Sequence, residues 1–303
     1  MMKKTILWHC VVALLSSLSA HATVEAGVLV GKWDFENTYQ DSSGNGYHFT
    51  PLGTPSFVQG VNGGVGVDFD GGSTDFFGDP GLVDALDTNG SLGGHPSRVS
   101  FNATGLSVMS WVNPDDLTFG ATLLSQDRSV QSARSYGYSV GIAADGRLSL
   151  GMRDSADNRL SVFSTATIDL NTWTHVAATW DGSLTGGMKL YINGVEVTTT
   201  LSKSGTFAGL QGPDVSIRSG ATHGDSANTI YGFDGALDNL SLWSGSLTAE
   251  EISADFRLGA HVAPEPMSLA IFGMLAYLFS LNRRRSNRTS QVSFHVSPYP
   301  NRN

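Results

Sequence analysis

The loop Asp41-Ser-Ser-Gly-Asn-Gly46 contains the residues of this chain that are best suited to binding chemistry. Asp41 offers a carboxylate, Asn45 offers an amide oxygen, and the two glycines allow backbone carbonyls to turn inward. Oxygen ligands of this kind suit the hard cation Ca²⁺. The same residue types also form Asx-turns, in which both side chains bond to their own backbone. The sequence therefore favours a calcium site or a purely structural turn, and leaves both open.

Paired carboxylates, which would indicate acid–base catalysis, do not stand out in the sequence. Hydrolysis of a glycosidic bond needs two carboxyl groups, one as acid and one as base or nucleophile. The five glutamates between residues 23 and 263 form no such pair on one strand, and Glu250 and Glu251 stand where acidic residues favour the start of a helix. Asp234 and Asp238 are interpreted as structural strand residues. We therefore expect no enzyme activity.

Other catalytic and metal-binding motifs are also missing from the sequence. There is no H-E-x-x-H zinc motif and no G-x-S-x-G nucleophile elbow. His175 lies in a segment of strand-like alternation, so it is interpreted as a structural histidine. The tryptophans after residue 23 are interpreted as core residues rather than sugar contacts: Trp33, Trp111, Trp173, Trp180 and Trp243.

The charge balance argues against nucleic acid as a partner. The chain carries 18 basic and 27 acidic side chains, a formal net charge of −9. Seven of the basic but only one of the acidic side chains lie outside residues 23–263, which leaves 11 and 26 there, a net charge near −15. Such a surface disfavours phosphate backbones and anionic lipids, and it suits cations and neutral ligands.

The N-terminal residues have the pattern of an export signal. Lys3 and Lys4 precede the apolar segment Ile6–Leu18, and Ala20-His21-Ala22 fits a cleavage site. Residues 1–22 are therefore predicted to be a signal peptide. The only cysteine, Cys10, lies inside it, so the exported domain has no disulfide and must be held by its core, helped by a metal if one binds.

Short alternating segments with glycine-rich turns predict an all-β sandwich for residues 23–260. Asp145-Gly146 and Asn193-Gly194 each separate two such segments and favour type I′ hairpin turns. One short C-terminal helix is expected, with Thr248 and Glu251 as a capping box and with Ile252 and Phe256 facing the domain. The expected strands are Val28–Phe35, Gly64–Phe69, Leu106–Val112, Ala121–Ser125, Tyr136–Ile142, Arg147–Met152, Thr174–Trp180, Met188–Ile192, Val195–Thr200, Val215–Ser219 and Ala236–Trp243.

Several of these segments resemble laminin-G-like, concanavalin A-type jelly rolls. The resemblance rests on Trp33-Asp-Phe-Glu36, Val67-Asp-Phe-Asp-Gly71, Leu106-Ser-Val-Met-Ser-Trp-Val112, Trp173-Thr-His-Val-Ala-Ala-Thr-Trp-Asp-Gly182, Leu190-Tyr-Ile-Asn-Gly194 and Phe233-Asp-Gly-Ala-Leu-Asp-Asn-Leu-Ser-Leu-Trp243, in that order. It implies a two-sheet antiparallel jelly-roll sandwich. It also implies that the loop at Asp41 lies near the last strands, which would bring Asp238 to Asp41 and Asn45 as a third ligand of a structural Ca²⁺.

The C-terminal residues resemble a PEP-CTERM sorting signal, which residues 264–285 would form. Pro264-Glu265-Pro266 is followed by the uncharged run Met267–Leu281 and then by Arg283-Arg284-Arg285. As a helix this run would be roughly 22 Å long, just short of a normal membrane span. The arginines would mark its cytoplasmic side. A plain C-terminal membrane anchor is the alternative, and residues 286–303 are expected to form a disordered tail.

The sorting resemblance implies a partner and a location. The partner would be an exosortase-type protease that acts at Pro264-Glu265-Pro266. The protein would be anchored transiently in the inner membrane of a Gram-negative bacterium and then reach the cell surface, the outer membrane or an extracellular matrix. Three functions stay open for the sandwich: binding of a polysaccharide or another surface ligand, adhesion to protein partners, and, least favoured, glycan degradation.

Overall fold

The computed structural model describes residues 27–71, 73–74, 85–87, 105–118, 120–130, 133–210, 217–221 and 230–260. The predicted signal peptide (1–22), the sorting signal (264–285) with its apolar run Met267–Leu281, and the tail (286–303) lie outside these residues. So does most of the glycine- and aspartate-rich stretch 71–97. Within the described residues, no helix is long and apolar enough to cross a membrane.

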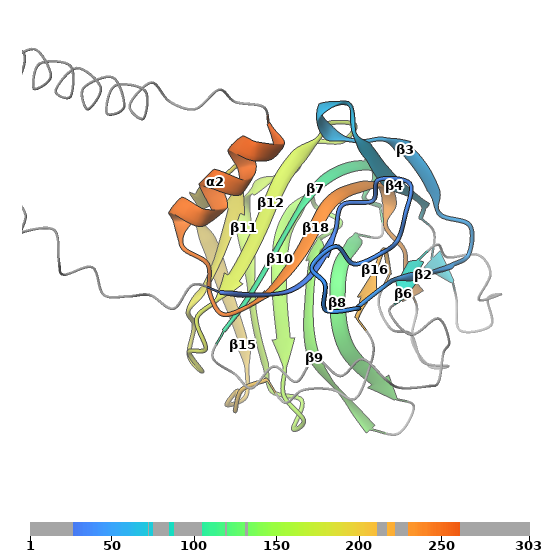
Figure 1. Cartoon of the computed structure of the whole chain (residues 1–303). Helices are drawn as coiled ribbons and strands as arrows, with labels where there is room; N and C mark the ends of the chain where they lie inside the picture. The colour runs from blue at the N-terminus through green and yellow to red at the C-terminus, as the bar shows by residue number, and fades with distance from the viewer. Residues whose placement is uncertain are drawn as a thin grey trace, which may run out of the picture. The chain divides into compact units, whose positions relative to one another are not determined.

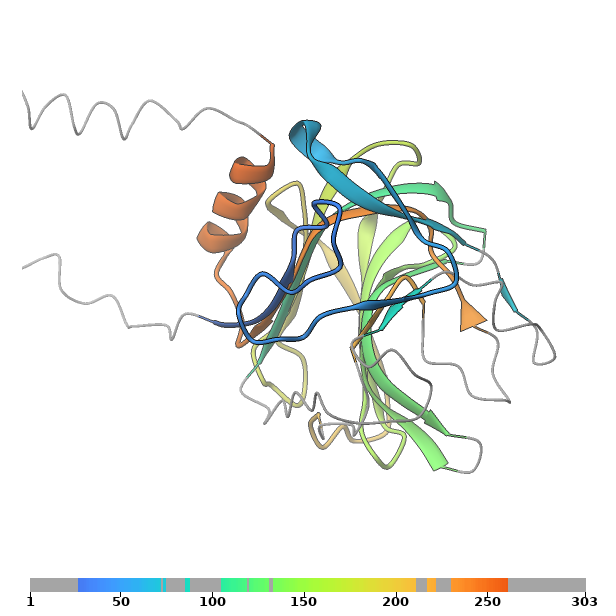
Figure 2. The same ribbon diagram turned by 45° about the vertical axis from the view of Figure 1, so that its right-hand side comes forward.

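Two antiparallel sheets form the body of the domain, which confirms the predicted all-β sandwich (Figures 1 and 2). In spatial order, sheet 1 contains β14 (Val195–Val197), β13 (Met188–Ile192), β12 (Thr174–Trp180), β7 (Leu106–Asp116), β18 (Asp234–Ser244), β4 (Val65–Asp70) and β3 (Ser56–Gln59), with β1 (Val28–Trp33) also paired to β18. Sheet 2 contains β15 (Thr199–Ser204), β11 (Arg159–Thr167), β10 (Arg147–Arg153), β9 (Ala133–Ile142), β8 (Ala121–Val130), β16 (Arg218–Ser219), β6 (Ala85–Asp87) and β2 (Thr50–Leu52). A small third sheet pairs β17 (Ile230–Tyr231) with β5 (Ser73–Thr74).

The main core fills the space between the two large sheets. Successive side chains of a strand point to opposite faces, so the alternating segments send one apolar row inward. Trp33, Phe69, Leu150 and Trp180 are all fully buried in this core. The ring of Trp33 stacks on that of Phe49, with the ring centroids 4.3 Å apart. Burial of these apolar side chains is the main force that holds the sheets together.

Strand β18 of sheet 1 carries Asp238, one of the predicted site residues. Its first half pairs with β4, its second half pairs with β1, and its other edge pairs with β7. The pairing with β7 shifts register between Asp238 and Ser241, where Asn239 has a φ of 51°. Irregularities of this kind change the direction of a nearby side chain, and Asp238 lies beside this one.

The predicted helix is present as α2 (Ala249–Gly259), and its capping box is confirmed. The backbone N–H of Glu251 donates to Oγ1 of Thr248 (3.2 Å), while Oε2 of Glu251 accepts from the backbone N–H of Thr248 (2.8 Å). These bonds satisfy two donors that the first turn would otherwise leave open. In both views the helix lies over the outer face of sheet 1 (Figures 1 and 2).

A second apolar cluster joins α2 to that outer face. Ile252 is fully buried, and it packs with Met109 of β7, Ala177 of β12, Tyr191 of β13 and Leu247. The sandwich therefore has a main core between its sheets and a smaller core beneath the helix.

The two predicted type I′ hairpin turns have different backbone conformations. At Asn193-Gly194 both residues have positive φ (51° and 75°), as a type I′ turn requires. At Asp145-Gly146 the prediction of a type I′ turn is wrong, because only Gly146 has positive φ (83°). The connection from β9 to β10 spans residues 143–146, with bonds from Gly146 N–H to the carbonyl of Ala143 and from Ala143 N–H to that of Arg147. A four-residue loop with one left-handed glycine needs no second positive φ.

Candidate functional site

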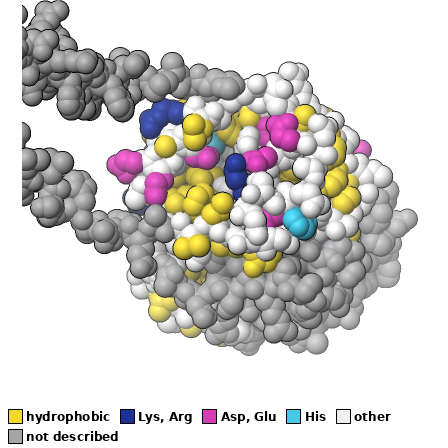
Figure 3. All heavy atoms as spheres, in the orientation of Figure 1, with side chains coloured by type: hydrophobic (Ala, Val, Ile, Leu, Met, Phe, Trp, Pro, Cys, Tyr) yellow, Lys and Arg dark blue, Asp and Glu magenta, His cyan; other side chains and the backbone are white. Residues whose placement is uncertain are grey.

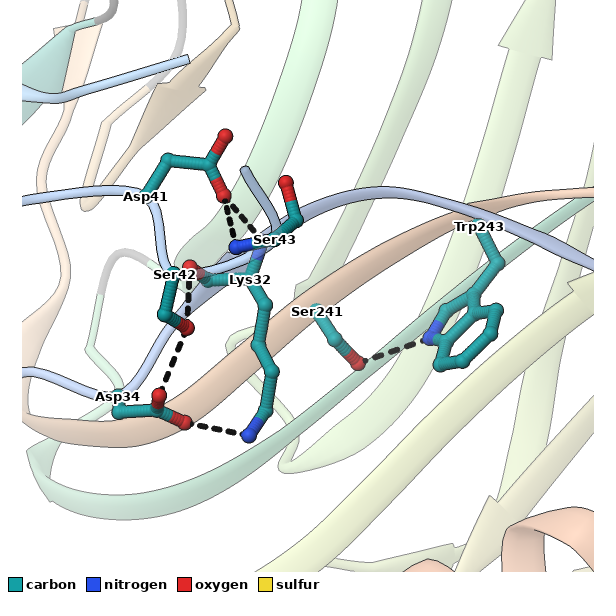
Figure 4. A network of polar contacts seen from close by, with 7 residues as sticks. All are labelled: Lys32, Asp34, Asp41, Ser42, Ser43, Ser241 and Trp243. Carbon is teal, nitrogen blue, oxygen red and sulfur yellow. Dashed lines mark hydrogen bonds and ion pairs between the residues drawn. The ribbon is translucent and has the colours of Figure 1, made fainter. Parts of the chain in front are cut away.

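The carboxylate of Asp41 is a backbone hydrogen-bond acceptor. It is 6% exposed, and its Oδ1 accepts the N–H groups of Lys32 (3.0 Å) and Ser43 (2.8 Å) (Figure 4). Its Oδ2 accepts the N–H of Tyr47 (2.9 Å). Burial alone would raise the pKa of Asp41, but the bonds from Ser43, Lys32 and Tyr47 outweigh it and hold that pKa below its usual value. Asp41 thus fastens its loop to β1.

Two neighbouring polar groups hold the same loop. The Nδ2 group of Asn45 donates to the carbonyls of Leu29 (3.1 Å) and Val30 (2.9 Å). The hydroxyl of Ser42 donates to Asp34 (2.7 Å), whose carboxylate also pairs with Lys32 at 2.7 Å (Figure 4). The loop Asp41–Gly46 therefore folds against β1 through side chain to backbone bonds.

Asp238 is bound to a different loop. Its carboxyl group is 1% exposed, and Oδ2 accepts the N–H of Val61 at 2.9 Å. Among the described residues, Oδ1 is buried without a hydrogen-bond partner. Burial raises the pKa of Asp238 to about 7; the bond from Val61 opposes this rise, and the carboxylates of Glu36 and Asp34 add to it.

These contacts limit what the predicted calcium ligands can offer. A carboxylate has about four lone-pair directions, of which Asp41 already uses three on N–H donors. Asn45 would have to bind a cation through Oδ1, because its Nδ2 donates to two carbonyls. In the described part of the chain, no three His, Cys, Asp or Glu side chains converge as a metal-binding group. These hydrogen bonds occupy much of the bonding capacity of Asp41 and Asn45, and calcium binding stays a prediction.

A hollow of about 650 Å³ opens on the outer face of sheet 1, beside the C-terminal end of α2. Three aromatic side chains, those of Trp111, Trp173 and Phe256, line it. Trp111 is buried, whereas Trp173 and Phe256 are only half-buried. The rings of Trp111 and Phe256 stack with their centroids 5.7 Å apart. On the face that carries α2, hydrophobic and acidic side chains are interspersed with few basic ones (Figure 3).

Trp111, which lines the hollow, belongs to a row of residues that runs across sheet 1. Trp111 of β7 lies opposite His175 of β12 on one side and opposite Asp238 of β18 on the other. His175 is fully buried, and its Nε2 is 3.1 Å from Oδ2 of Asp255 in α2. A side chain at Gly259 would collide with the indole nitrogen of Trp111. The end of α2 can therefore approach the sheet closely.

Among the described residues, the remaining lining of the hollow carries amide groups and small residues but no charged side chain. Amide side chains come from Gln59, Asn62 and Asn193, and the other lining residues are Gly60, Val61, Gly63, Gly259 and Ala260. Oδ1 of Asn193 accepts the N–H of His175 at 3.0 Å, and Nδ2 of Asn62 donates to the carbonyl of Gly259. The hollow thus combines aromatic faces with fixed amide groups.

The sequence-based interpretation of the tryptophans is confirmed in part. Trp33, Trp111 and Trp180 are buried. Trp173 is half-buried and lines the hollow. Its position directly before β12, and so outside the strand, is the sequence signal that could have distinguished it from the core tryptophans.

Residues 87–253 match the sequence profile of the concanavalin A-like lectin/glucanases superfamily. The chain belongs to this superfamily. Two curated relatives match a shorter part of the chain. Pentraxin-related protein PTX3 of Bos taurus is 34% identical over 99 residues, and pappalysin-1 of Mus musculus is 35% identical over 97 residues. Each match covers 32% of this chain, but only 25% and 6% of the respective relative.

Solved structures with a similar fold include an arabinanase domain and a botulinum neurotoxin structure. Domain 4 of AbnA, a GH43 extracellular arabinanase from Geobacillus stearothermophilus, was solved with arabinotriose; it has a TM-score of 0.52 and 22% identity. The match covers 77% of this chain and 99% of that domain. A botulinum neurotoxin type C structure, described as interacting with two ganglioside molecules, has a TM-score of 0.50 and 17% identity, over 77% of this chain and 51% of its own. At these identities the likeness shows the fold alone.

The raised pKa of Asp238 predicts an unusual pH dependence of stability. The folded state holds the proton up to about pH 7, whereas the unfolded chain releases it near 3.8. The stabilisation that this bound proton gives the folded state is fully present below the unfolded pKa. It is lost as the pH rises through about 7, which lowers the free energy of unfolding by at most about 4 kcal/mol. Asp238→Asn should therefore gain stability relative to the wild type between about pH 4 and pH 8, as measured by thermal unfolding.

Asp41→Asn is the matched control, because the pKa of Asp41 is lowered by folding. Its stabilisation is present above the unfolded pKa near 3.8 and is lost as the pH falls further. This variant should lose stability relative to the wild type as the pH rises through that region and should then stay level. Parallel curves for wild type and Asp238→Asn between about pH 4 and pH 8 would show that Asp238 titrates normally in the folded state.

Proposed function

We propose that the chain is an exported surface or extracellular-matrix protein whose sandwich binds carbohydrate in the hollow beside α2. The observation that carries this proposal is the combination of half-buried Trp173 and Phe256 with the amide groups of Gln59, Asn62 and Asn193 in one hollow. Its volume of about 650 Å³ is within the range that holds small ligands.

The chemistry of the lining suits a sugar ring. One face of a sugar ring carries mainly C–H bonds and can stack on an aromatic ring, while its hydroxyl groups need hydrogen-bond donors and acceptors. Aromatic rings give contact area with a small loss of conformational freedom. Amides both donate and accept, so they can bond hydroxyl groups without placing a charge in the site.

Two of the structurally similar proteins support a carbohydrate ligand for this chain. The arabinanase domain was solved in complex with arabinotriose, and the neurotoxin structure is described by its interaction with gangliosides. The same fold also holds proteins of other functions, so the hollow, and not the fold, has to carry the argument.

The protein acts in this proposal as a binding module and not as an enzyme. Asp238 and Asp255, two carboxyl groups close to the hollow, already bond to Val61 N–H and to His175. Neither is among the residues that line the hollow. An adhesive protein that binds protein partners is the second candidate, favoured by Leu258 of α2, which is 79% exposed close to the lining residue Gly259.

Trp173→Ala tests the glycan site. Loss of the aromatic face should weaken binding to a neutral polysaccharide by about tenfold or more, which corresponds to about 1.4 kcal/mol. Phe163→Ala is the matched control, because Phe163 is a half-buried aromatic residue on the outer face of sheet 2. The control should bind as the wild type does. Affinity can be measured by calorimetry with the purified chain, and a loss in the control alone would place the ligand on sheet 2.

Export and sorting are the second part of the proposal. An exosortase-type protease would act at Pro264-Glu265-Pro266, remove the apolar run Met267–Leu281 with Arg283-Arg284-Arg285, and release the protein from its transient membrane anchor. The residue pattern in the sequence supports this step. The destination would be the cell surface, the outer membrane or the extracellular matrix of a Gram-negative bacterium.

Intact-mass analysis of surface material tests both terminal predictions. The mature chain should begin near Thr23 and should lack the run Met267–Leu281. An N-terminus at Met1 would contradict the signal peptide. Mature protein that keeps the apolar run would favour a plain membrane anchor over the sorting signal.

Calcium binding by Asp41, Asn45 and Asp238 is a further proposal. A cation would have to join the N–H donors around Asp41 or replace one of them, and it would meet the buried Oδ1 of Asp238. A ligand that binds only the folded state stabilises it by roughly 2.7 kcal/mol at a hundredfold excess over Kd.

Thermal unfolding with millimolar Ca²⁺ or with a chelator measures this effect. The midpoint should rise by several degrees in Ca²⁺, and Asp238→Asn should reduce the gain. Equal midpoints in the two conditions would assign Asp41 and Asn45 to their hydrogen bonds alone.

A further inference from the structure

We propose that the hollow selects neutral sugars and rejects sugars that carry a carboxylate. This inference rests on the proposed glycan function and adds the class of its ligand. The charges in and around the hollow carry it.

Among the described residues, those that line the hollow include no ionisable side chain. The described part of the wall consists of aromatic and amide groups together with backbone and small apolar residues. A bound acidic sugar would therefore have no guanidinium or ammonium group beside its carboxylate. Proteins that recognise carboxylates usually supply such a group, because the charge-assisted bond offsets the loss of hydration.

Carboxylates stand behind the wall on both sides. On the side of the loop 60–65, Asp238 bonds to Val61 N–H, and Oε1 of Glu36 accepts the N–H of Val65 at 3.2 Å. On the side of the helix, Asp255 precedes Phe256 and bonds to His175. The negative charges of Glu36 and Asp255 extend their potential into a concave site, where the protein displaces water and weakens screening. Asp238 adds to this potential only above about pH 7, where its carboxyl group ionises.

The basic side chains closest in sequence to these groups lie outside the lining of the hollow. Arg257 of α2 donates from Nη1 to Oγ of Ser253 at 3.0 Å, one turn back toward the start of the helix. Lys32 pairs with Asp34 at 2.7 Å. Neither side chain lines the hollow, so neither supplies the missing counter-charge.

Polar groups remain for the hydroxyls of a neutral sugar. Asn62 uses its Nδ2 on the carbonyl of Gly259, which leaves Oδ1 as an acceptor. Asn193 uses Oδ1 on the N–H of His175, which leaves Nδ2 as a donor. Gln59 is exposed at the rim and adds one more amide. Donors and acceptors of this kind bond hydroxyl groups without a charge.

The test compares binding of the purified chain to a neutral polysaccharide, dextran or arabinan, and to an acidic one, polygalacturonate or alginate. We expect affinity for the neutral ligand to be about tenfold higher or more. The difference should shrink as salt rises, because salt screens the repulsion. A preference that does not respond to salt would overturn the electrostatic basis of the inference.

A positive charge added at the rim sharpens the test. Gln59→Lys should raise affinity for the acidic polysaccharide about fivefold or more at low salt, since it places an ammonium group beside the hollow. Thr200→Lys makes the same change of charge at an exposed position of β15 in sheet 2, and it should leave the affinity unchanged. Equal gains in the two variants would mean that only the overall charge matters, which would contradict selection by the hollow.

The two levels of the proposal fail in different ways. If the wild type binds the acidic polysaccharide as tightly as the neutral one, and Trp173→Ala abolishes both, the ligand class is wrong but the glycan site stands. If neither class binds, the proposed function itself is wrong and this inference falls with it. If neutral binding does not depend on Trp173, the ligand lies elsewhere on the protein.

Discussion

The docking of α2 on the outer face of sheet 1 is the constraint on which the candidate site depends. The capping box at Thr248 and Glu251 fixes where the helix starts, and Ile252 fixes its contact with Met109, Ala177 and Tyr191. Phe256 follows Ile252 by four residues, so it lies on the same face of the helix and stacks on Trp111. Beyond this contact the helix ends, and the space between its last residues and the loop 60–63 is the hollow.

A row of polar groups beneath the helix follows from the same geometry. His175 and Asp238 flank Trp111 on neighbouring strands, and each is fastened to an element above the sheet, His175 to Asp255 of α2 and Asp238 to Val61 of the loop. Buried polar groups cost free energy unless they are bonded. A buried carboxyl group with one oxygen bonded and the other without a partner among the described residues is therefore costly when ionised. We interpret this cost as a consequence of the bond by which Asp238 holds the loop 60–63 against the sheet.

The fold was largely predictable because alternation and capping are local signals. The bounds predicted for β12 and β13 agree with the structure, as does the capping box of α2. The alternating strand β11 (Arg159–Thr167) was missed, and the segment predicted from Val195 to Thr200 is divided between β14 of sheet 1 and β15 of sheet 2. A crossing from one sheet to the other depends on which neighbours a strand finds, and alternation within one segment does not determine this.

The candidate site was much less predictable, since it depends on contacts between distant segments. The sequence left two interpretations of Asp41 open, a calcium ligand and a turn residue. In the structure its carboxylate accepts the N–H groups of Lys32, Ser43 and Tyr47. Trp173 and Phe256 are 83 residues apart, and only the docked helix brings them to one hollow. A single segment cannot reveal an aromatic surface that two elements share.

The most direct measurement is a crystal structure of the protein with a neutral oligosaccharide. The account predicts a sugar ring against Trp173 or Phe256, with its hydroxyl groups bonded to the amides of Gln59, Asn62 or Asn193. A sugar bound at the outer face of sheet 2 or at the loop Asp41–Gly46, with the hollow beside α2 unchanged, would contradict it.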